Sequence, residues 1–136
     1  GMGGLGHTRV LVVDDSDTMR QAIGDALRTV KGCSVVAEGA NGLEAVRLTR
    51  AHRPCLVVMD IHMPLMSGLE AARLIKSDVP NTHVVLVTSE LYPEVQTHAL
   101  NLGVAACLEK NTQMWGALRA MVSGLSHSCP ATECDA

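Results

Sequence analysis

The chain has 136 residues, enough for one domain with a single hydrophobic core. Its formal charge of −3 argues against direct nucleic-acid binding, which needs a basic face. No apolar stretch of about 18 or more residues is present and no signal-like segment opens the chain, so we expect no membrane contact and a cytoplasmic location.

Five strands and five helices are expected to alternate along the chain. Apolar runs predict strands at residues 9–13, 34–37, 55–59, 83–87 and 104–108. A helix is predicted after each strand: one that ends at Gly32, one that begins at Asn41, and others at residues 67–76, 92–102 and 112–125. Alternation at this spacing predicts an α/β fold with a parallel sheet and right-handed crossovers.

Two of these helices carry sequence signals for their first turn. Asn41 is followed three positions later by Glu44, and Ser67 is followed by Glu70 at the same spacing. In such a capping box the first residue accepts a hydrogen bond from a backbone N–H of the helix, and the acid returns to a backbone N–H near the cap. We therefore expect both helices to begin at these caps.

The two ends of the chain lie outside the alternating pattern. Residues 1–7 are rich in glycine and are expected to be a flexible lead-in. Residues 126–136 contain Pro130 and no apolar periodicity, which is typical of a disordered tail or the start of a linker. The predicted domain is therefore residues 8–125.

Cysteine usage is the sequence's main indication of redox environment. The chain has five cysteines, and Cys33, Cys55 and Cys107 fall in or beside predicted strands. Small buried thiols in a reducing cytosol fit this distribution better than a disulfide framework does.

Polar residues stand where the predicted strands end. Asp14 and Asp15 follow the first strand, Asp60 the third, Thr88 the fourth and Lys110 the fifth. In a parallel sheet these ends share one edge, where open α/β folds bind ligands. Three neighbouring carboxylates repel one another, and a hard divalent cation such as Mg²⁺ relieves that repulsion. A lysine and a hydroxyl beside them predict a site for a phosphoryl group.

Four motifs at four successive strand ends carry a family resemblance. They are Val12-Val13-Asp14-Asp15, Met59-Asp60-Ile61-His62-Met63-Pro64-Leu65-Met66-Ser67-Gly68, Val87-Thr88-Ser89 and Glu109-Lys110. Their order and spacing resemble the receiver domain of two-component response regulators. The resemblance covers about residues 8–125 and implies a single doubly wound (βα)5 flavodoxin-like domain, with a five-stranded parallel sheet of order 2-1-3-4-5.

The resemblance also implies roles for individual residues. Asp60 matches the phosphoacceptor, which takes a phosphoryl group from a sensor histidine kinase or a phosphotransfer protein. Asp15 matches the direct Mg²⁺ ligand and Asp14 its acidic neighbour, while Asp60 and the backbone carbonyl of His62 complete the metal site. The resemblance therefore implies that the domain is not an enzyme. It implies a signalling phosphoacceptor that assists its own phosphorylation and dephosphorylation.

The predicted switch departs from the family pattern in two places. Thr88 matches the hydroxyl that moves toward the phosphoryl group, and Lys110 the cation that pairs with it. Asn111 follows the lysine where receivers commonly have proline, and Cys107 stands where they often have an aromatic residue. We therefore expect the output to pass through loop and helix shifts around residues 89–95, or through docking. The resemblance places a downstream protein, an output domain or a second copy of the chain on the surface of the fourth helix, fifth strand and fifth helix.

Two other functions stay open from the sequence. Asp15-Ser16-Asp17-Thr18 is close to the motif of phosphohydrolases that use an aspartate nucleophile, here Asp15, although its threonine comes one position early. A receiver-like scaffold that is never phosphorylated is the third hypothesis, kept open by Cys107 and Asn111.

Overall fold

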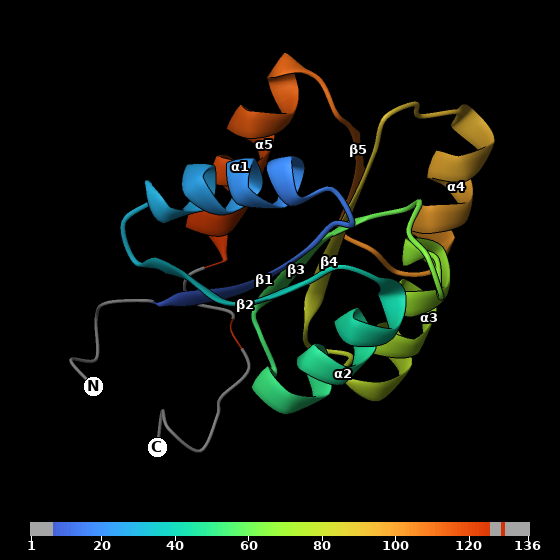
Figure 1. The fold of residues 1–136 in the computed structure, drawn as a ribbon, viewed down its shortest axis with the longest axis horizontal. Coiled ribbons are helices and arrows are strands. Elements are labelled where there is room, and N and C mark those ends of the chain that lie inside the picture. Colours follow the sequence, from blue (N-terminus) through green and yellow to red (C-terminus); the bar gives the residue numbers. More distant parts are fainter. Residues whose placement is uncertain (1–6, 126–128, 130–136) are drawn as a thin grey trace.

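The computed structural model describes residues 7–125 and residue 129. Five strands and five helices alternate as predicted (Figure 1). Their bounds are β1 (Thr8–Val13), α1 (Asp17–Arg28), β2 (Cys33–Gly39), α2 (Gly42–His52), β3 (Leu56–Asp60), α3 (Gly68–Asp78), β4 (His83–Thr88), α4 (Pro93–Asn101), β5 (Ala106–Glu109) and α5 (Thr112–Gly124).

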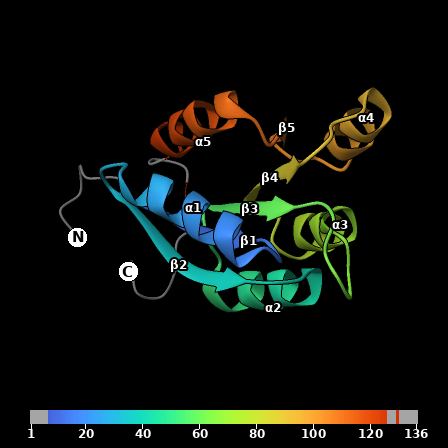
Figure 2. The same ribbon diagram turned by 45° about the horizontal axis from the view of Figure 1, so that its top comes forward.

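The strands form one parallel sheet in the order β2-β1-β3-β4-β5, which confirms the predicted flavodoxin-like topology. Helices α1 and α5 cover one face, and α2, α3 and α4 cover the other (Figures 1 and 2). All five residues of the central strand β3 are buried, which explains its uninterrupted apolar run before Asp60.

Alternate residues of the strands point into two separate cores. Leu11, Val57 and Leu86 pack beneath α2 and α3, whereas Val58 and Val85 pack against α1 and α5. This division follows from the strand period of two, which sends successive side chains to opposite faces of the sheet. Both cores consist mainly of aliphatic side chains, with Met59, Cys107 and Met114 among them and Trp115 partly buried against the second, in keeping with a chain that has no phenylalanine.

The predicted helix caps are present. The side chains of Asn41 and Ser67 accept hydrogen bonds from the N–H groups of Glu44 and Glu70, at 2.8 and 3.2 Å. The Glu44 carboxylate also accepts a hydrogen bond from the N–H of Ala40 at 3.0 Å, so it binds the backbone just before the helix. Glu70 pairs with a nearby arginine of α3 instead, so only the first half of its capping box is formed.

The predicted end of the first helix was wrong. Helix α1 ends at Arg28. The backbone N–H of its C-cap Thr29 donates to the carbonyl of Ala26, and that of Val30 donates to the carbonyl of Leu27. Gly32 lies farther on, in the turn before β2, where its φ of 81° requires the conformational freedom of glycine. The glycine therefore turns the chain into the strand and does not stop the helix.

The expectation that the cysteines are free thiols was also wrong in part. Cys33 and Cys107 are free, but Cys55 is disulfide-bonded to Cys129 across a sequence separation of 74 residues. The two Cα atoms lie 4.5 Å apart, within the range that a disulfide needs. Only the tertiary fold brings the start of β3 beside a residue that follows α5. The predicted lead-in and tail otherwise lie outside the described residues, except for residues 7 and 129.

Candidate functional site

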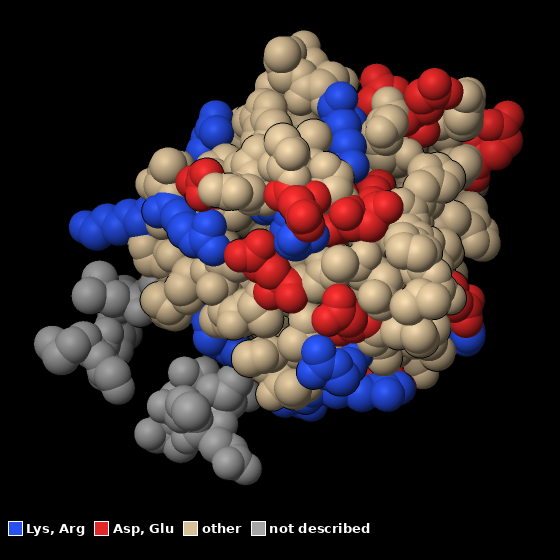
Figure 3. All heavy atoms as spheres, in the orientation of Figure 1, with Lys and Arg blue, Asp and Glu red and all other residues tan. Residues whose placement is uncertain are grey.

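Three acidic side chains meet at the carboxyl edge of the sheet. Asp14 and Asp15 follow β1, Asp60 is the last residue of β3, and these two strands are neighbours. One carboxylate oxygen from each residue lies within 4.8 Å of those of the other two. Asp14 is fully buried, Asp60 is 6% exposed and Asp15 is exposed, so the cluster opens to solvent on the Asp15 side. Acidic side chains gather near the end of β1 in the space-filling view (Figure 3).

Lys110 supplies the positive charge of this cluster. Its Nζ lies 2.9 Å from Oδ2 of Asp14 and 3.5 Å from Oδ2 of Asp60. Its backbone N–H donates to the carbonyl of Thr88 at 2.8 Å, which attaches the loop after β5 to the end of β4. The predicted acids and the predicted lysine are therefore brought together although they are far apart in sequence.

The surroundings of Asp60 disfavour its charge. Burial raises the pKa of the Asp60 carboxyl above its ordinary value, the nearby Lys110 charge lowers it, and the charge of Asp14 raises it again. The N–H of His62 donates to Oδ1 of Asp60 at 3.4 Å and supports the ionised form. The balance leaves the pKa raised, so this carboxylate gains from any further positive charge placed beside it.

Asp14 is held more firmly than its neighbour Asp15. Its Oδ1 accepts a hydrogen bond from the N–H of Ser16 at 2.9 Å, and its other oxygen accepts from Lys110. The guanidinium of Arg20 donates to the backbone carbonyl of Asp14 at 2.7 Å. Ser16 and Arg20 could not be assigned a role from the sequence, since an N-cap serine and a surface arginine are common at any helix start.

Gly68 is a third residue whose structural role could not be assigned from the sequence. A Cβ at this position would lie 2.2 Å from the carbonyl oxygen of Asp60, so only glycine fits there. Its N–H donates to the carbonyl of Ile61 at 2.7 Å, which closes the loop between β3 and α3 onto the strand end. The glycine therefore lets α3 begin directly beside the backbone of Asp60.

Thr88 lies at the end of β4, fully buried, with its hydroxyl directed to the loop that follows. Its Oγ1 donates to the carbonyl of Glu90 at 3.3 Å. The next residue, Leu91, donates its N–H to Oε1 of Glu109 at 2.9 Å, which joins this loop to the end of β5. Cys107, on β5, is buried and only 3% exposed.

The residue after Lys110 has a defined local role. All peptide bonds of the described chain are trans, including the one between Lys110 and Asn111. The side chain of Asn111 accepts a hydrogen bond from the N–H of Gln113 at 3.0 Å and caps α5. Asparagine in place of proline therefore begins the last helix directly after the site lysine.

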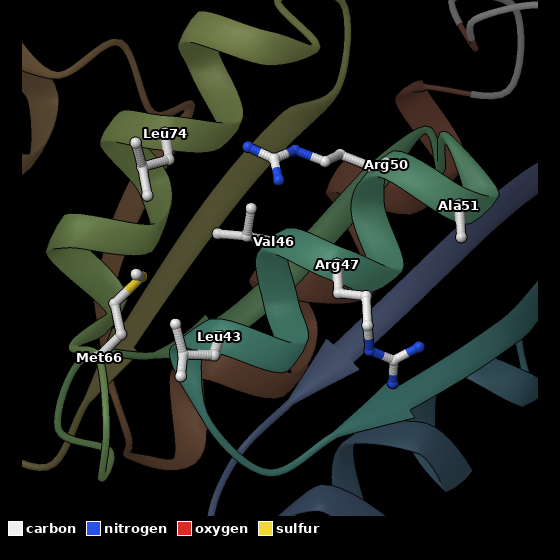
Figure 4. Close-up of a pocket in the computed structure, with 7 residues that line it drawn as sticks. All are labelled: Leu43, Val46, Arg47, Arg50, Ala51, Met66 and Leu74. Carbon is white, nitrogen blue, oxygen red and sulfur yellow. The ribbon is translucent and has the colours of Figure 1, made fainter.

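An apolar pocket of about 590 Å³ lies between α2 and α3, away from the acidic cluster (Figure 4). The side chains of Val46, Met66 and Leu74 point into it, with Arg50 across its opening. None of the predicted site residues lines it. Its lining residues are Leu43, Val46, Arg47, Arg50, Ala51, Met66 and Leu74.

Comparison with known proteins agrees with this geometry. Residues 10–122 match the family described as "Response regulator receiver domain". The chain belongs to that family. Receiver domains belong to two-component systems, and the flavodoxin-like fold is the one found in this chain.

The receiver resembles the corresponding part of several larger proteins. It is 44% identical over 104 residues to a protein-glutamate methylesterase/protein-glutamine glutaminase of Myxococcus xanthus, with 75% of this chain and 29% of that protein covered. It is 38% identical to the response regulator protein VraR of Staphylococcus aureus, with 76% and 50% covered. The chain thus spans half or less of the length of these relatives.

Solved structures give the same result. The response regulator domain of CheB from Thermotoga maritima superposes with a TM-score of 0.81 at 30% identity, covering 91% of this chain and 99% of that one. The receiver domain of NarL from Mycobacterium tuberculosis has a TM-score of 0.79 at 30% identity, covering 88% and 98%. In the described part of this receiver, no helix has the length and apolar character needed to cross a bilayer.

Proposed function

We propose that this receiver accepts a phosphoryl group on Asp60 in a Mg²⁺-dependent reaction, from a sensor histidine kinase or a phosphotransfer protein in the cytoplasm. The observation that carries the proposal is the convergence of three carboxylates and one lysine at the carboxyl edge of the sheet. Phosphoryl transfer asks for little besides positioning and charge neutralisation, and this cluster supplies both.

The donor set fits Mg²⁺. Carboxylate oxygens of Asp14, Asp15 and Asp60 lie within 4.8 Å of one another, and hard oxygen ligands with an opening for water suit this ion. The backbone carbonyl of His62 is the further ligand that we expect. When bound, the ion supplies positive charge to the carboxylates and to the phosphoryl oxygens.

The chain's own residues account for the remaining steps. One oxygen of the Asp60 carboxylate attacks phosphorus in line with the donor bond, which breaks as the new O–P bond forms. Lys110, at 3.5 Å from Asp60, neutralises charge on the transferred group. The His62 N–H holds the other carboxylate oxygen, so the nucleophile is oriented before the donor arrives.

The output begins with Thr88. A phosphoryl group on Asp60 offers strong acceptor oxygens, and the Thr88 hydroxyl leaves the Glu90 carbonyl to reach them. The loop at residues 89–95 then repacks, and the Leu91–Glu109 hydrogen bond passes the change to β5. The α4–β5–α5 surface is where we place the downstream protein, the output domain or a second copy of the chain.

One contact favours this proposal over an Asp15 phosphohydrolase. The second acid of the Asp15-Ser16-Asp17 motif pairs with Arg20 at 2.5 Å, and the Asp17 side chain is 90% exposed. Asp17 is also not part of the acidic cluster. An unphosphorylated scaffold is disfavoured because the acids and the lysine are all in place.

The test uses acetyl phosphate with Mg²⁺ and intact-mass measurement. Wild-type protein gains one phosphoryl group, Asp60→Asn gains none, and the matched control Asp17→Asn labels like wild type. Chelation of the metal removes the labelling. Sustained hydrolysis of a small phosphoester that is lost in Asp15→Asn and kept in Asp60→Asn would support the phosphohydrolase, and absence of labelling in wild type would support the scaffold.

A further inference from the structure

The Cys55–Cys129 pair lies at the opposite edge of the sheet from Asp60. Cys55 directly precedes β3, whereas Asp60 is the last residue of that strand. Cys129 follows α5, whose end is joined to the start of β1 by a hydrogen bond from the Thr8 hydroxyl to the Val122 carbonyl at 3.3 Å. Figure 1 shows that α5 ends on the side of the sheet where β1 begins. Neither cysteine has a part in the phosphoryl chemistry.

The two sulfur atoms differ in their surroundings. Cys55 is fully buried, while Cys129 is partly exposed. The N–H of Arg9 donates to Sγ of Cys55 at 3.1 Å, so a backbone donor is already directed at this sulfur. Such a donor stabilises a thiolate, which a buried sulfur otherwise disfavours. Cys129 is thus the cysteine that an outside thiol can approach, and the buried Cys55 has a donor that helps its sulfur leave.

We infer that Cys55 and Cys129 form a reversible redox-modification site that joins the segment after α5 to the start of β3 under oxidising conditions and releases it under reducing ones. The inference rests on the proposed function only for the cytoplasmic setting, where disulfides are rare and are usually transient or redox-sensing. The co-reactant is a low-molecular-weight disulfide for oxidation and the corresponding thiol for reduction.

The chemistry is thiol–disulfide exchange. In oxidation, the Cys129 thiolate attacks a low-molecular-weight disulfide, forms a mixed disulfide and expels one thiolate. The Cys55 thiolate then attacks Sγ of Cys129 and expels the second. Two protein thiols lose two electrons and two protons, and one outside disulfide becomes two thiols. Reduction is the reverse, with attack on Sγ of the partly exposed Cys129 and departure of the Cys55 thiolate toward the Arg9 N–H.

The structural consequence falls on the end of α5. The disulfide adds a covalent link near a helix end that is also held by the Thr8–Val122 hydrogen bond and by the packing of Met121, Val122 and Leu125. Loss of the link leaves the last turn of α5 with fewer restraints. Since α5 belongs to the proposed output surface, the redox state of the pair changes that surface from the edge opposite Asp60.

The experiment equilibrates the full chain in buffers of reduced and oxidised glutathione, followed by alkylation and peptide mapping. We expect a reversible change between a linked Cys55–Cys129 peptide pair and two alkylated cysteines. Hydrogen exchange at the last turn of α5 should become about tenfold faster on reduction, as local opening becomes easier. Cys129→Ser should show the faster exchange in both buffers, while the control Cys33→Ser should behave like wild type.

Several results would overturn the inference. The first is that Cys129 still reacts with the alkylating agent in the most oxidising buffer, and the second is that Cys129 is linked to Cys134 or to another chain. The third is that thiols reduce the Cys55–Cys129 link only after denaturation. The fourth is that hydrogen exchange in α5 is the same in both redox states. Labelling of Asp60 by acetyl phosphate is measured in the same samples. Failure of that labelling, with the redox result intact, would count against the proposed function alone.

Discussion

The two edges of the sheet are built on opposite principles. At the carboxyl edge, buried carboxylates repel one another and Lys110 alone of the described cations lies within ion-pair distance of them. At the amino edge, neutral groups satisfy one another: the Cys55 N–H donates to Arg9, the Cys55 carbonyl accepts from His83, and the Thr82 hydroxyl donates to Pro54. The first edge concentrates repulsion between carboxylates that a bound cation would relieve, and the second contributes to stability.

The largest expected effect comes from a substitution at the amino edge. It tests whether this edge contributes only to stability and not to the reactivity of Asp60. Cys129→Ser opens a covalent loop between residues separated by 74 positions, which in the chain-entropy model costs about 4 kcal/mol of the free energy of unfolding. Urea unfolding under oxidising conditions measures this loss. Labelling of Asp60 by acetyl phosphate should stay within about twofold of wild type, because the site lies at the other end of β3. A larger change in labelling would show that the edges are coupled.

The second effect is the removal of the site's cation. Lys110→Met leaves the fully buried Asp14 without its partner at 2.9 Å, and breaking such a pair costs about 3 kcal/mol of the free energy of unfolding. Saturating Mg²⁺ should restore part of that stability, which urea unfolding with and without the ion measures. The exposed Lys31→Met serves as the control and should change neither value. Equal destabilisation by both variants would contradict the electrostatic explanation of the carboxyl edge.

The third effect separates packing from charge at the same edge. Gly68→Ala places a Cβ 2.2 Å from the Asp60 carbonyl, so the backbone must shift, at a cost of about 2 kcal/mol and with about tenfold slower labelling of Asp60. The matched control is Gly116→Ala in α5, where a Cβ meets nothing within 4 Å. That variant should be more stable than wild type by about 0.5 kcal/mol, since alanine favours helix. Thermal unfolding and labelling kinetics distinguish the two.

The smallest effect is a gain of stability, expected from Asp60→Asn in metal-free buffer. Burial raises the pKa of the folded Asp60 carboxyl, so its ionisation opposes folding. Below the unfolded value, near 3.8, the carboxyl is protonated in both states and the variant should match wild type. As the pH rises through the unfolded and then the folded pKa, wild type loses stability relative to the variant, and the difference is largest at neutral pH.

Urea unfolding across this pH range tests the direction of the effect. Asp25→Asn is the control, because that side chain is 65% exposed on α1 and its charge is solvated. A variant that is less stable than wild type at neutral pH would show that the Asp60 charge supports the fold instead of straining it.

The sequence by itself determined most of the carboxyl edge. Strand periodicity placed Asp14, Asp60 and Lys110 after apolar runs, and in a parallel sheet every strand ends on the same side, so local pattern was enough to predict their meeting. The strand order came with the family resemblance. The caps at Asn41 and Ser67 were also readable, because capping depends on residues three positions apart.

Tertiary structure alone decided the rest. Glycine is required at position 68 because α3 begins against the backbone of Asp60. The spacing of residues in the sequence does not predict this contact. The Leu91–Glu109 hydrogen bond and the Cys55–Cys129 disulfide join residues 18 and 74 positions apart. The local sequence pattern indicates which face of a helix or strand is buried. Which residue from a distant part of the chain contacts that face depends on how the sheet and its helices pack together.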